Sequence, residues 1–285
     1  KTTPSPIKGQ TRMALHVPDR SPVSDEVLIN RLKHLYDPVV VKGLAASLGR
    51  LRENRETKAA EEFVEHYAGR MCDLSEFMKT LKQRLTQSYN RRHARTGTLW
   101  EERFKSILVE GQGDALATIA SYIDLNPVRA GLVEDPKDFR HSGYGEATGG
   151  SGVARQGLIH IVSAMGECDS WRKAAARYRQ LVYVRGEERG IDEHGRAIKR
   201  GFDADTVQQV LDANGHLPKS ILLRCRVRYF TDGVVLGSRG YVDDVFHRHR
   251  EQFSPKRKTG ARAMRGGDWG DLVTARCLRL APITA

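Results

Sequence analysis

Residues 114–133, DALATIASYIDLNPVRAGLV, begin with the pattern of a short helix. Apolar residues recur there at three- and four-residue spacing and would share one face: Leu116, Ile119, Ala120 and Ile123. We expect the helix to begin at Asp114 and to end at Asn126-Pro127, because a residue that precedes proline disfavours helical dihedral angles. The segment therefore predicts a helix with one face in a core.

A longer helix is predicted upstream, over residues 73–92. Its apolar stripe, which we expect to be buried, comprises Leu74, Phe77, Met78, Leu81, Leu85 and Tyr89. After a turn at Gly97, the run RFKSILV at residues 103–109 is typical of a strand, since it is rich in β-branched and aromatic residues. Closer to the N-terminus, Ser24 is a candidate cap for a polar helix.

Glycine and small residues cluster around residues 145–157, which predicts a linker between two domains. We place the domains at residues 1–148 and 169–285, with the linker at 149–168. The second domain is expected to be mostly helical, with one helix that begins at Asp169 or Ser170, one over residues 203–215 and one after Ser238. It also contains a predicted β-hairpin with Asp232-Gly233 in the turn.

Composition favours a polyanionic partner. The 285 residues include 47 Lys and Arg against 35 Asp and Glu, a formal net charge of +12. No basic amphipathic helix with Trp and Leu opposite its charges is visible, so nucleic acid is favoured over a membrane surface. No apolar run approaches the roughly 18 residues that a membrane-spanning helix needs. The four cysteines lie far apart, which argues against a zinc ribbon or a disulfide scaffold and favours a cytoplasmic protein.

Tyr122 and Asn126 are the first candidates for chemistry. They lie four residues apart and would share one helix face. A tyrosine beside an amide oxygen can act as a nucleophile next to a metal-bound phosphate. Without further context the ordinary interpretation is structural, with the tyrosine packing in the core and the asparagine stopping the helix.

Two longer stretches change this interpretation. FMKTLKQRLTQSYNRRHARTGTLWEERFKSILVE, residues 77–110, and YIDLNPVRAGLVEDPKDFRHSGYGEA, residues 122–147, together closely resemble the REP-associated branch of the single-tyrosine HUH transposases. The resemblance implies that Tyr122 attacks single-stranded DNA to form a 5′-phosphotyrosine link. It also implies that Asn126 helps to bind a divalent metal, Mg²⁺ or Mn²⁺. The implied fold is α+β, a small antiparallel sheet flanked by helices with an HUH or ferredoxin-like core.

The chain departs from this family at its N-terminal end. The two histidines of the family's metal motif correspond to Gln10 and Arg12, so the ligand set is incomplete and Arg12 would repel a cation. His247 and His249 have the right spacing but fall in a predicted helix, where positions i and i+2 point to different faces. The chain opens on Lys1 rather than Met, and strands that normally precede the motif are absent, so we expect its natural N-terminus to lie upstream.

A basic and aromatic block is the candidate DNA-binding surface. Its cations surround Trp100 and Phe104, and they are Arg91, Arg92, His93, Arg95, Arg103 and Lys105. Proteins that bind single strands combine such a cationic track with aromatic rings on which bases stack. Arg224, Arg226 and Arg228 alternate on a predicted strand, and the face they share is either a β-ribbon on DNA or the solvated side of a hairpin. A predicted flexible tract is suited to phosphate contacts without sequence readout, and its cations are Lys256, Arg257, Lys258, Arg262 and Arg265.

Three functions remain open at this stage. The chain is a transposase that cleaves single-stranded hairpin DNA, a relative that binds such DNA without cleaving it, or a basic RNA-associated protein. The missing histidines favour binding with little or no metal-dependent cleavage. The sequence is compatible with a monomer or a homodimer.

Overall fold

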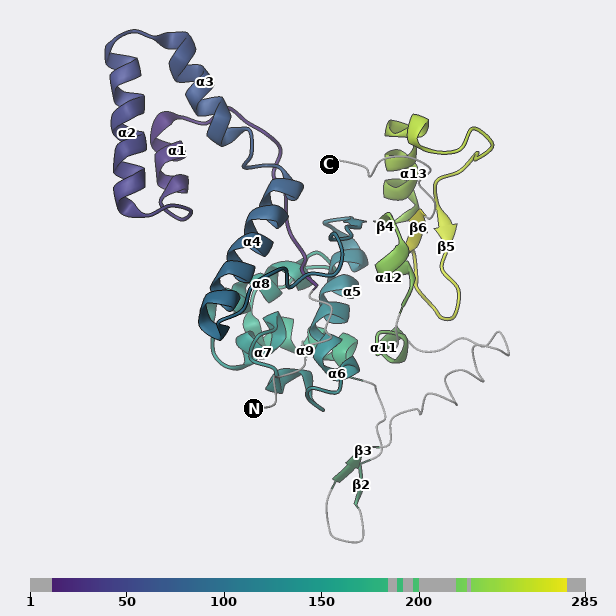
Figure 1. Cartoon of the computed structure of the whole chain (residues 1–285). Helices are drawn as coiled ribbons and strands as arrows, with labels where there is room; N and C mark the ends of the chain where they lie inside the picture. Colours follow the sequence, from purple (N-terminus) through teal and green to yellow (C-terminus); the bar gives the residue numbers. More distant parts are fainter. Residues whose placement is uncertain (1–11, 184–188, 192–196, 200–218, 225–226, 276–285) are drawn as a thin grey trace. The chain divides into compact units, whose positions relative to one another are not determined.

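The computed structural model describes residues 12–183, 189–191, 197–199, 219–224 and 227–275 (Figure 1). The fold is α+β, and the chain divides into two compact units. The helical unit is Leu15–Phe104, and the core unit comprises Lys1–Ala14 and Lys105–Ala285. This division differs from the expected domains at 1–148 and 169–285, because the segment after Phe104 shares one core with the C-terminal half.

The helical unit contains α1 (Asp25–Leu32), α2 (Pro38–Glu53), α3 (Thr57–Ala68) and α4 (Leu74–His93). The expected cap at Ser24 is confirmed, since its hydroxyl accepts the Val27 N–H at 3.3 Å. A small core forms among the first helices, around Leu28, Leu32 and Val41.

The long helix predicted over residues 73–92 is confirmed as α4. Asp73 caps it, and its carboxylate accepts the backbone N–H groups of Ser75 at 2.6 Å and Glu76 at 3.0 Å. The expected burial of its apolar stripe is wrong, because no residue of α4 is fully buried and Phe77 and Leu85 are 45% and 46% exposed. Helical spacing predicts a shared face, but only a packing partner buries it.

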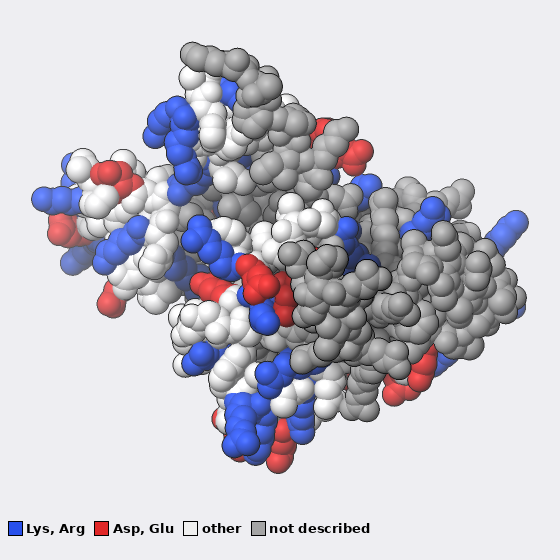
Figure 2. All heavy atoms as spheres, turned by 90° about the horizontal axis from the view of Figure 1, so that it is seen from below, with Lys and Arg blue, Asp and Glu red and all other residues white. Residues whose placement is uncertain are grey.

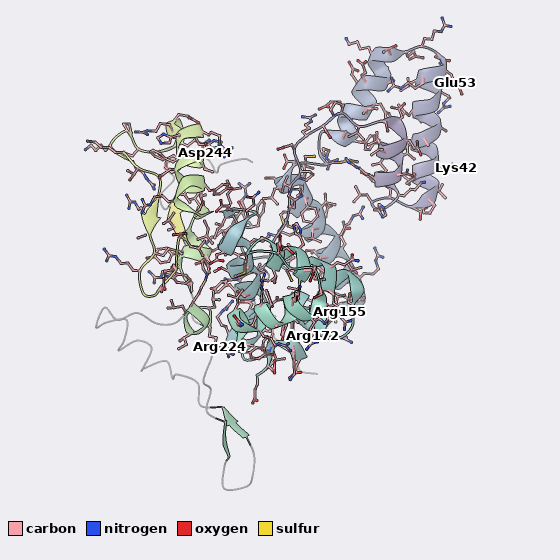
Figure 3. The ribbon with its side chains drawn as sticks, turned by 180° about the vertical axis from the view of Figure 1, so that it is seen from behind. Lys42, Glu53, Arg155, Arg172, Arg224 and Asp244 are labelled. Atoms are coloured by element: carbon pink, nitrogen blue, oxygen red, sulfur yellow. The ribbon has the colours of Figure 1, made fainter. Side chains whose placement is uncertain are left out.

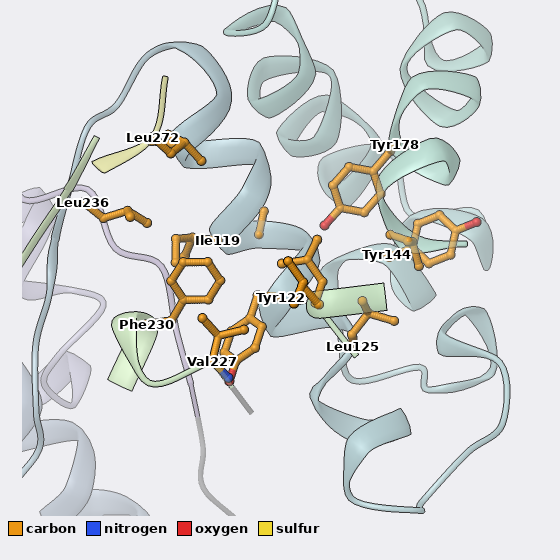
Figure 4. Close-up of a cluster of buried hydrophobic side chains, with 14 of the residues drawn as sticks. Ile119, Tyr122, Leu125, Tyr144, Tyr178, Val227, Phe230, Leu236 and Leu272 are labelled. Atoms are coloured by element: carbon orange, nitrogen blue, oxygen red, sulfur yellow. The ribbon is translucent and has the colours of Figure 1, made fainter. Parts of the chain in front are cut away.

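The core unit begins with the short strand β1 (Leu108–Val109), within the run of residues 103–109 predicted to be a strand. The helices that follow are α5 (Gly113–Asp124), α6 (Asn126–Arg129), η1 (Pro136–Asp138), α7 (Gly143–Thr148), α8 (Gly152–Ser163) and α9 (Trp171–Val182). Helix α5 confirms the helical pattern that follows Asp114, although it begins at Gly113 and ends at Asp124. The expected stop at Asn126-Pro127 is wrong, because Asn126 and Pro127 form the first turn of α6, where proline is tolerated. Leu158 of α8 and Tyr178 of α9 belong with α5 to the main core (Figure 4).

The linker expected at residues 149–168 is not one, because most of it is the helix α8. Ser151 caps this helix through the Ala154 N–H, and Leu158 and Val162 are buried in the main core. Gly150 has a φ of +108°, which only glycine adopts without strain, and it lies in the turn between α7 and α8. The glycine cluster therefore marks a tight turn between two packed helices.

A four-stranded sheet has the order β1-β4-β6-β5, with β4 at Val235–Gly237, β5 at Arg262–Ala263 and β6 at Val273–Ala275. Strand β1 pairs in parallel with β4, whereas β4 and β5 are antiparallel to β6. The sheet is therefore mixed, not antiparallel as expected. Helix α13 (Arg239–Arg248) follows β4 directly and begins after Ser238, as predicted.

The hairpin predicted around Asp232-Gly233 is also wrong. Short helices α11 (Lys219–Leu222) and α12 (Tyr229–Asp232) occupy this region instead, and Val227 and Phe230 pack into the main core. Consequently Arg224 and Arg228 do not lie on a strand, and Arg226 lies outside the described residues, as does the helix predicted over 203–215.

Three smaller elements complete the described structure. Strands β2 (Arg189–Ile191) and β3 (Ala197–Lys199) form an antiparallel pair, and η2 (Arg250–Gln252) follows α13. Within the described residues, every helix is too short or too polar to cross a membrane.

Candidate nucleic-acid interface and the Tyr122 environment

The last turn of α4 concentrates positive charge. Arg91, Arg92 and His93 are all exposed there, next to the negative end of the helix dipole. The helix ends at Ala94, which has a left-handed φ of +48°, and the side-chain amide of Asn90 donates to the carbonyl of Gly97 at 2.8 Å. These local bonds hold the turn that leads from the helix to Arg95.

Aromatic rings lie among these cations, but not quite as expected. The Tyr89 and His93 rings stack with centroids 4.2 Å apart, and the Arg95 guanidinium lies 5.9 Å from the Tyr89 ring centroid. Trp100 is half-buried, because its indole N–H donates to Thr86 at 3.0 Å and Lys82 lies over its ring. Trp100 is therefore held against α4. The sequence assigned Tyr89 to a buried stripe and missed its pairing with His93.

Acidic groups do little to neutralise this region. Residues 82–105 hold seven Lys and Arg but only two Glu. Among the ion pairs of the described residues, Arg91, Arg95 and Arg103 have no acidic partner, and all three are exposed. Figure 2 shows one face of the molecule, with Lys and Arg at several places on its described surface.

We call the set of Tyr89, Arg91, Arg92, His93 and Arg95 the α4-end surface. Arg103 is exposed but follows Glu102, whose carbonyl accepts the Lys82 ammonium at 2.9 Å near the middle of α4, so it is not part of this surface. Lys105, the last cation of the predicted block, is exposed but belongs to the core unit. The predicted block is thus divided at the boundary between the two units, and its other members lie in the helical unit.

Tyr122 lies in the main core of the core unit (Figure 4). It is 1% exposed, its hydroxyl accepts the Val227 N–H at 3.3 Å, and its ring meets the Phe230 ring edge-on at 4.9 Å. A phosphodiester cannot reach the hydroxyl in this conformation. For Tyr122 to act as the nucleophile implied by the resemblance, the segment from Val227 to Phe230 would have to move away.

Two arginines contact the Tyr122 ring. The Arg129 and Arg12 guanidinium groups lie 3.8 Å and 4.8 Å from its centroid. Arg129 also donates to the carbonyls of Tyr122 and Leu223, both at 2.6 Å, and more weakly to Asn126 Oδ1 at 3.4 Å. Tyr122 and Asn126 are thus linked through Arg129, which bonds to the backbone of one and the side chain of the other at the C-terminal end of α5.

These residues do not fit a divalent cation. The one oxygen donor expected for the metal, Asn126 Oδ1, faces a guanidinium, and Arg12 adds a second positive charge beside the ring. No group of three or more His, Cys, Asp or Glu side chains comes together among the described residues. Gln10 lies outside them, and His247 and His249 lie at the end of α13. The metal site therefore remains a prediction from the resemblance.

A buried carboxylate, Asp124, lies between Tyr122 and Asn126 in the sequence and therefore points to a different side of the helix. Asp124 accepts the Tyr178 hydroxyl at 2.5 Å and the Tyr144 N–H at 3.2 Å, which ties α5 to α9 and α7. Burial raises the pKa of Asp124, although these hydrogen bonds act in the opposite direction. Burial likewise raises the pKa of Tyr178, so the hydroxyl keeps its proton and donates. The hydrogen bonds of Asp124 and Tyr178 join helices to one another, so both groups have a structural role.

Comparison with protein-family models, with curated proteins and with solved structures found no match to this chain.

Proposed function

We propose that this chain binds single-stranded or hairpin DNA through the α4-end surface and does not cleave it in the conformation described. The observation that carries the proposal is the gathering of exposed cations and the Tyr89–His93 ring pair at one helix end. The net charge of +12 supports it, as does the sequence resemblance to single-tyrosine HUH transposases.

Physical chemistry explains why such a surface suits a single strand. Each phosphate that a Lys or Arg neutralises releases a counterion, which gives affinity without sequence preference. Unpaired bases expose their faces and stack on aromatic side chains for about 1–3 kcal/mol each. Charge and rings together therefore favour an unpaired strand or a hairpin loop over a fully paired duplex.

Cleavage is the second candidate. In that case the core unit is an HUH-like domain, Tyr122 forms the phosphotyrosine link, and Asn126 helps to hold Mg²⁺ or Mn²⁺ for DNA transposition. The contact of Arg12 with the Tyr122 ring favours this relationship, since residue 12 corresponds to a histidine of the family's metal motif. The burial of the hydroxyl and the two guanidinium groups oppose it. For either function we expect a cytoplasmic protein that works as a monomer or homodimer.

Binding is tested with fluorescently labelled hairpin and single-stranded oligonucleotides across a salt series. We expect binding that weakens steeply with salt, because each phosphate neutralised on a single strand adds roughly 0.7 to the slope of log affinity against log salt. The Arg91→Ala/Arg92→Ala variant should bind at least about tenfold more weakly and show a slope smaller by roughly 1.4.

The matched control is Lys42→Ala/Arg50→Ala, which removes the same charge from α2 of the same unit. This variant should bind almost as the unmodified chain does. Equal losses in both variants would show that only net charge matters and would overturn the α4-end surface. A covalent adduct with Mn²⁺ that disappears in Tyr122→Phe would establish cleavage instead.

A further inference from the structure

A second basic surface lies in the core unit, on the loop between η2 and β5, on β5 itself and directly after it. Residues 254–265, SPKRKTGARAMR, contain five Lys and Arg and no Asp or Glu. Four of these side chains are exposed: Lys256, Lys258, Arg262 and Arg265. We call these four the C-terminal basic surface. The fifth cation, Arg257, is buried, so the prediction that it contacts phosphate is wrong.

The loop is fixed by side chains rather than by regular secondary structure. Arg250 donates to the carbonyls of Ser254 at 3.2 Å, Pro255 at 3.0 Å and Arg257 at 2.9 Å. Arg257 in turn donates to the carbonyls of Thr259, at 2.9 Å, and Gly260. Two arginines thus hold the backbone of the loop from inside, and the tract is not a loose chain.

Aromatic and acidic side chains from α13 and the loop after it complete this support. The Arg257 guanidinium lies 5.6 Å from the Phe246 ring centroid and 5.0 Å from that of Phe253, and both rings are buried. Asp243 accepts the N–H groups of Gly260 at 3.0 Å and Ala261 at 2.8 Å, so its charge is directed at the loop backbone. The neighbouring acid on α13 is Asp244, which is labelled in Figure 3, and its carboxylate pairs with Arg248 at 2.7 Å.

The exposed cations therefore project from a fixed backbone. Arg262 lies on β5, the edge strand of the sheet, opposite Thr274 of β6. Among the described ion pairs none involves Lys256, Lys258, Arg262 or Arg265. Cations on a pre-organised backbone lose less entropy when they bind a rigid array of phosphates than cations on a flexible tail do.

The absence of an exposed ring among residues 254–265 distinguishes this surface from the α4-end surface. The segment contains no aromatic residue, and the nearby Phe246, Phe253 and Trp269 are buried. Tyr229 is half-buried and meets the segment through its hydroxyl, which accepts the Arg265 N–H at 3.1 Å. A surface without exposed rings cannot stack on unpaired bases, so it gains no affinity from a single strand beyond the charge of the phosphates. The backbone of a duplex presents phosphates in a regular array, which cations alone can bind. We propose that the C-terminal basic surface binds the backbone of double-stranded DNA, without sequence preference, and that the α4-end surface binds the unpaired strand. This inference deepens the proposed function and rests on it.

The test compares full-length variants on two probes, a blunt DNA duplex and an oligothymidine that cannot pair. The variant Lys256→Ala/Lys258→Ala/Arg262→Ala/Arg265→Ala should bind the duplex at least about tenfold more weakly at fixed salt. Its salt slope on the duplex should fall by up to about 3.6, at roughly 0.9 for each phosphate neutralised. Its affinity for oligothymidine should stay within about twofold. Because the substituted residues lie in the core unit, the fold of the variant is checked separately, by a circular dichroism spectrum and a Tm equal to those of the unmodified chain.

Two controls separate the surfaces. Arg262→Ala/Arg265→Ala is matched by Arg172→Ala/Arg179→Ala, which removes two exposed arginines from α9 of the same unit (Figure 3). Arg91→Ala/Arg92→Ala should show the reverse pattern, with weaker binding to oligothymidine and little change on the duplex. Equal duplex losses in the two arginine pairs of the core unit would overturn the C-terminal basic surface and leave the proposed function intact.

Other results bear on the proposals separately. If the unmodified chain binds the duplex but the fourfold variant binds it equally well, only the further inference fails. If the unmodified chain shows no salt-dependent binding to oligothymidine, the proposed function fails. A fourfold variant that loses binding to phosphatidylserine vesicles but not to the duplex would assign the surface to a membrane and overturn the inference.

Discussion

Replacing Tyr122 with phenylalanine separates a structural from a catalytic tyrosine. The change keeps the ring, and with it the packing against Phe230 and the Arg129 guanidinium. It removes the oxygen that accepts the Val227 N–H, and Val227 is itself buried. A buried donor without a partner costs about 1–3 kcal/mol, so the free energy of unfolding should fall by that amount. For a unit of this size, Tm should fall by roughly 2–12 °C.

Thermal and urea denaturation of the full chain measure this loss. Tyr36→Phe is the matched control, because Tyr36 is 36% exposed and water can replace any partner of its hydroxyl. The control should change the free energy of unfolding by less than about 0.5 kcal/mol. An equal Tm for both variants would refute the buried hydrogen bond, as would an Mn²⁺-dependent covalent DNA adduct that Tyr122→Phe abolishes at unchanged stability.

Three further substitutions test the elements around the two surfaces. Asp73→Ala removes the cap of α4 and should lower the free energy of unfolding by about 1 kcal/mol in a urea titration; no change would mean that the cap bonds are not formed in solution. Ala94→Gly relieves the left-handed φ at the end of α4 and should raise stability by about 0.5–1 kcal/mol, and a loss would contradict that backbone conformation. Asp124→Asn tests the buried carboxylate. Burial raises the pKa of Asp124 in the folded state, so the folded chain holds the proton of this acid more tightly than the unfolded chain does. The contribution of Asp124 to the free energy of unfolding is therefore largest at low pH and declines as the pH rises through the folded-state pKa. The stability of Asp124→Asn relative to the unmodified chain should therefore increase from about pH 4 to about pH 7, and a decrease would show that the hydrogen bonds from Tyr178 and Tyr144 outweigh burial.

The helices near the candidate surfaces could be predicted because their signals are local. Asp73, Ser24 and Ser238 each accept a backbone N–H two or three residues later, so the residues that start a helix lie beside it in the sequence. The cations of the α4 end were found for the same reason, since they are close together in the chain. The pairing of Tyr89 with His93 follows from four-residue spacing and was missed because burial was assumed for the whole stripe.

The sheet could not be predicted, since its pairing joins distant residues. Leu108 pairs with Val235, and nothing in the two-residue strand β1 identifies a partner so far along the chain. A similar distance separates Glu110 from Ser238, whose N–H and hydroxyl both donate to the Glu110 carboxylate. The predicted hairpin failed because one core buries both Val227 and Phe230. Side chains three residues apart share one face in a helical turn but point to opposite faces of a strand, so this burial favours the turn and the short helix α12.

Tyr122 and Asn126 show why spacing alone does not define an active site. Four-residue spacing brings the two side chains to one face whether that face is open or covered. Here the cover comes from Val227 and Phe230, and Arg129 satisfies the carbonyl of Tyr122 while it contacts Asn126. An arginine with these bonds cannot leave without exposing buried carbonyls, so opening the site costs more than moving one loop. A catalytic role for Tyr122 therefore requires a second conformation of this end of α5, in which Val227 and Phe230 no longer cover its hydroxyl and the bonds of Arg129 to the backbone are broken.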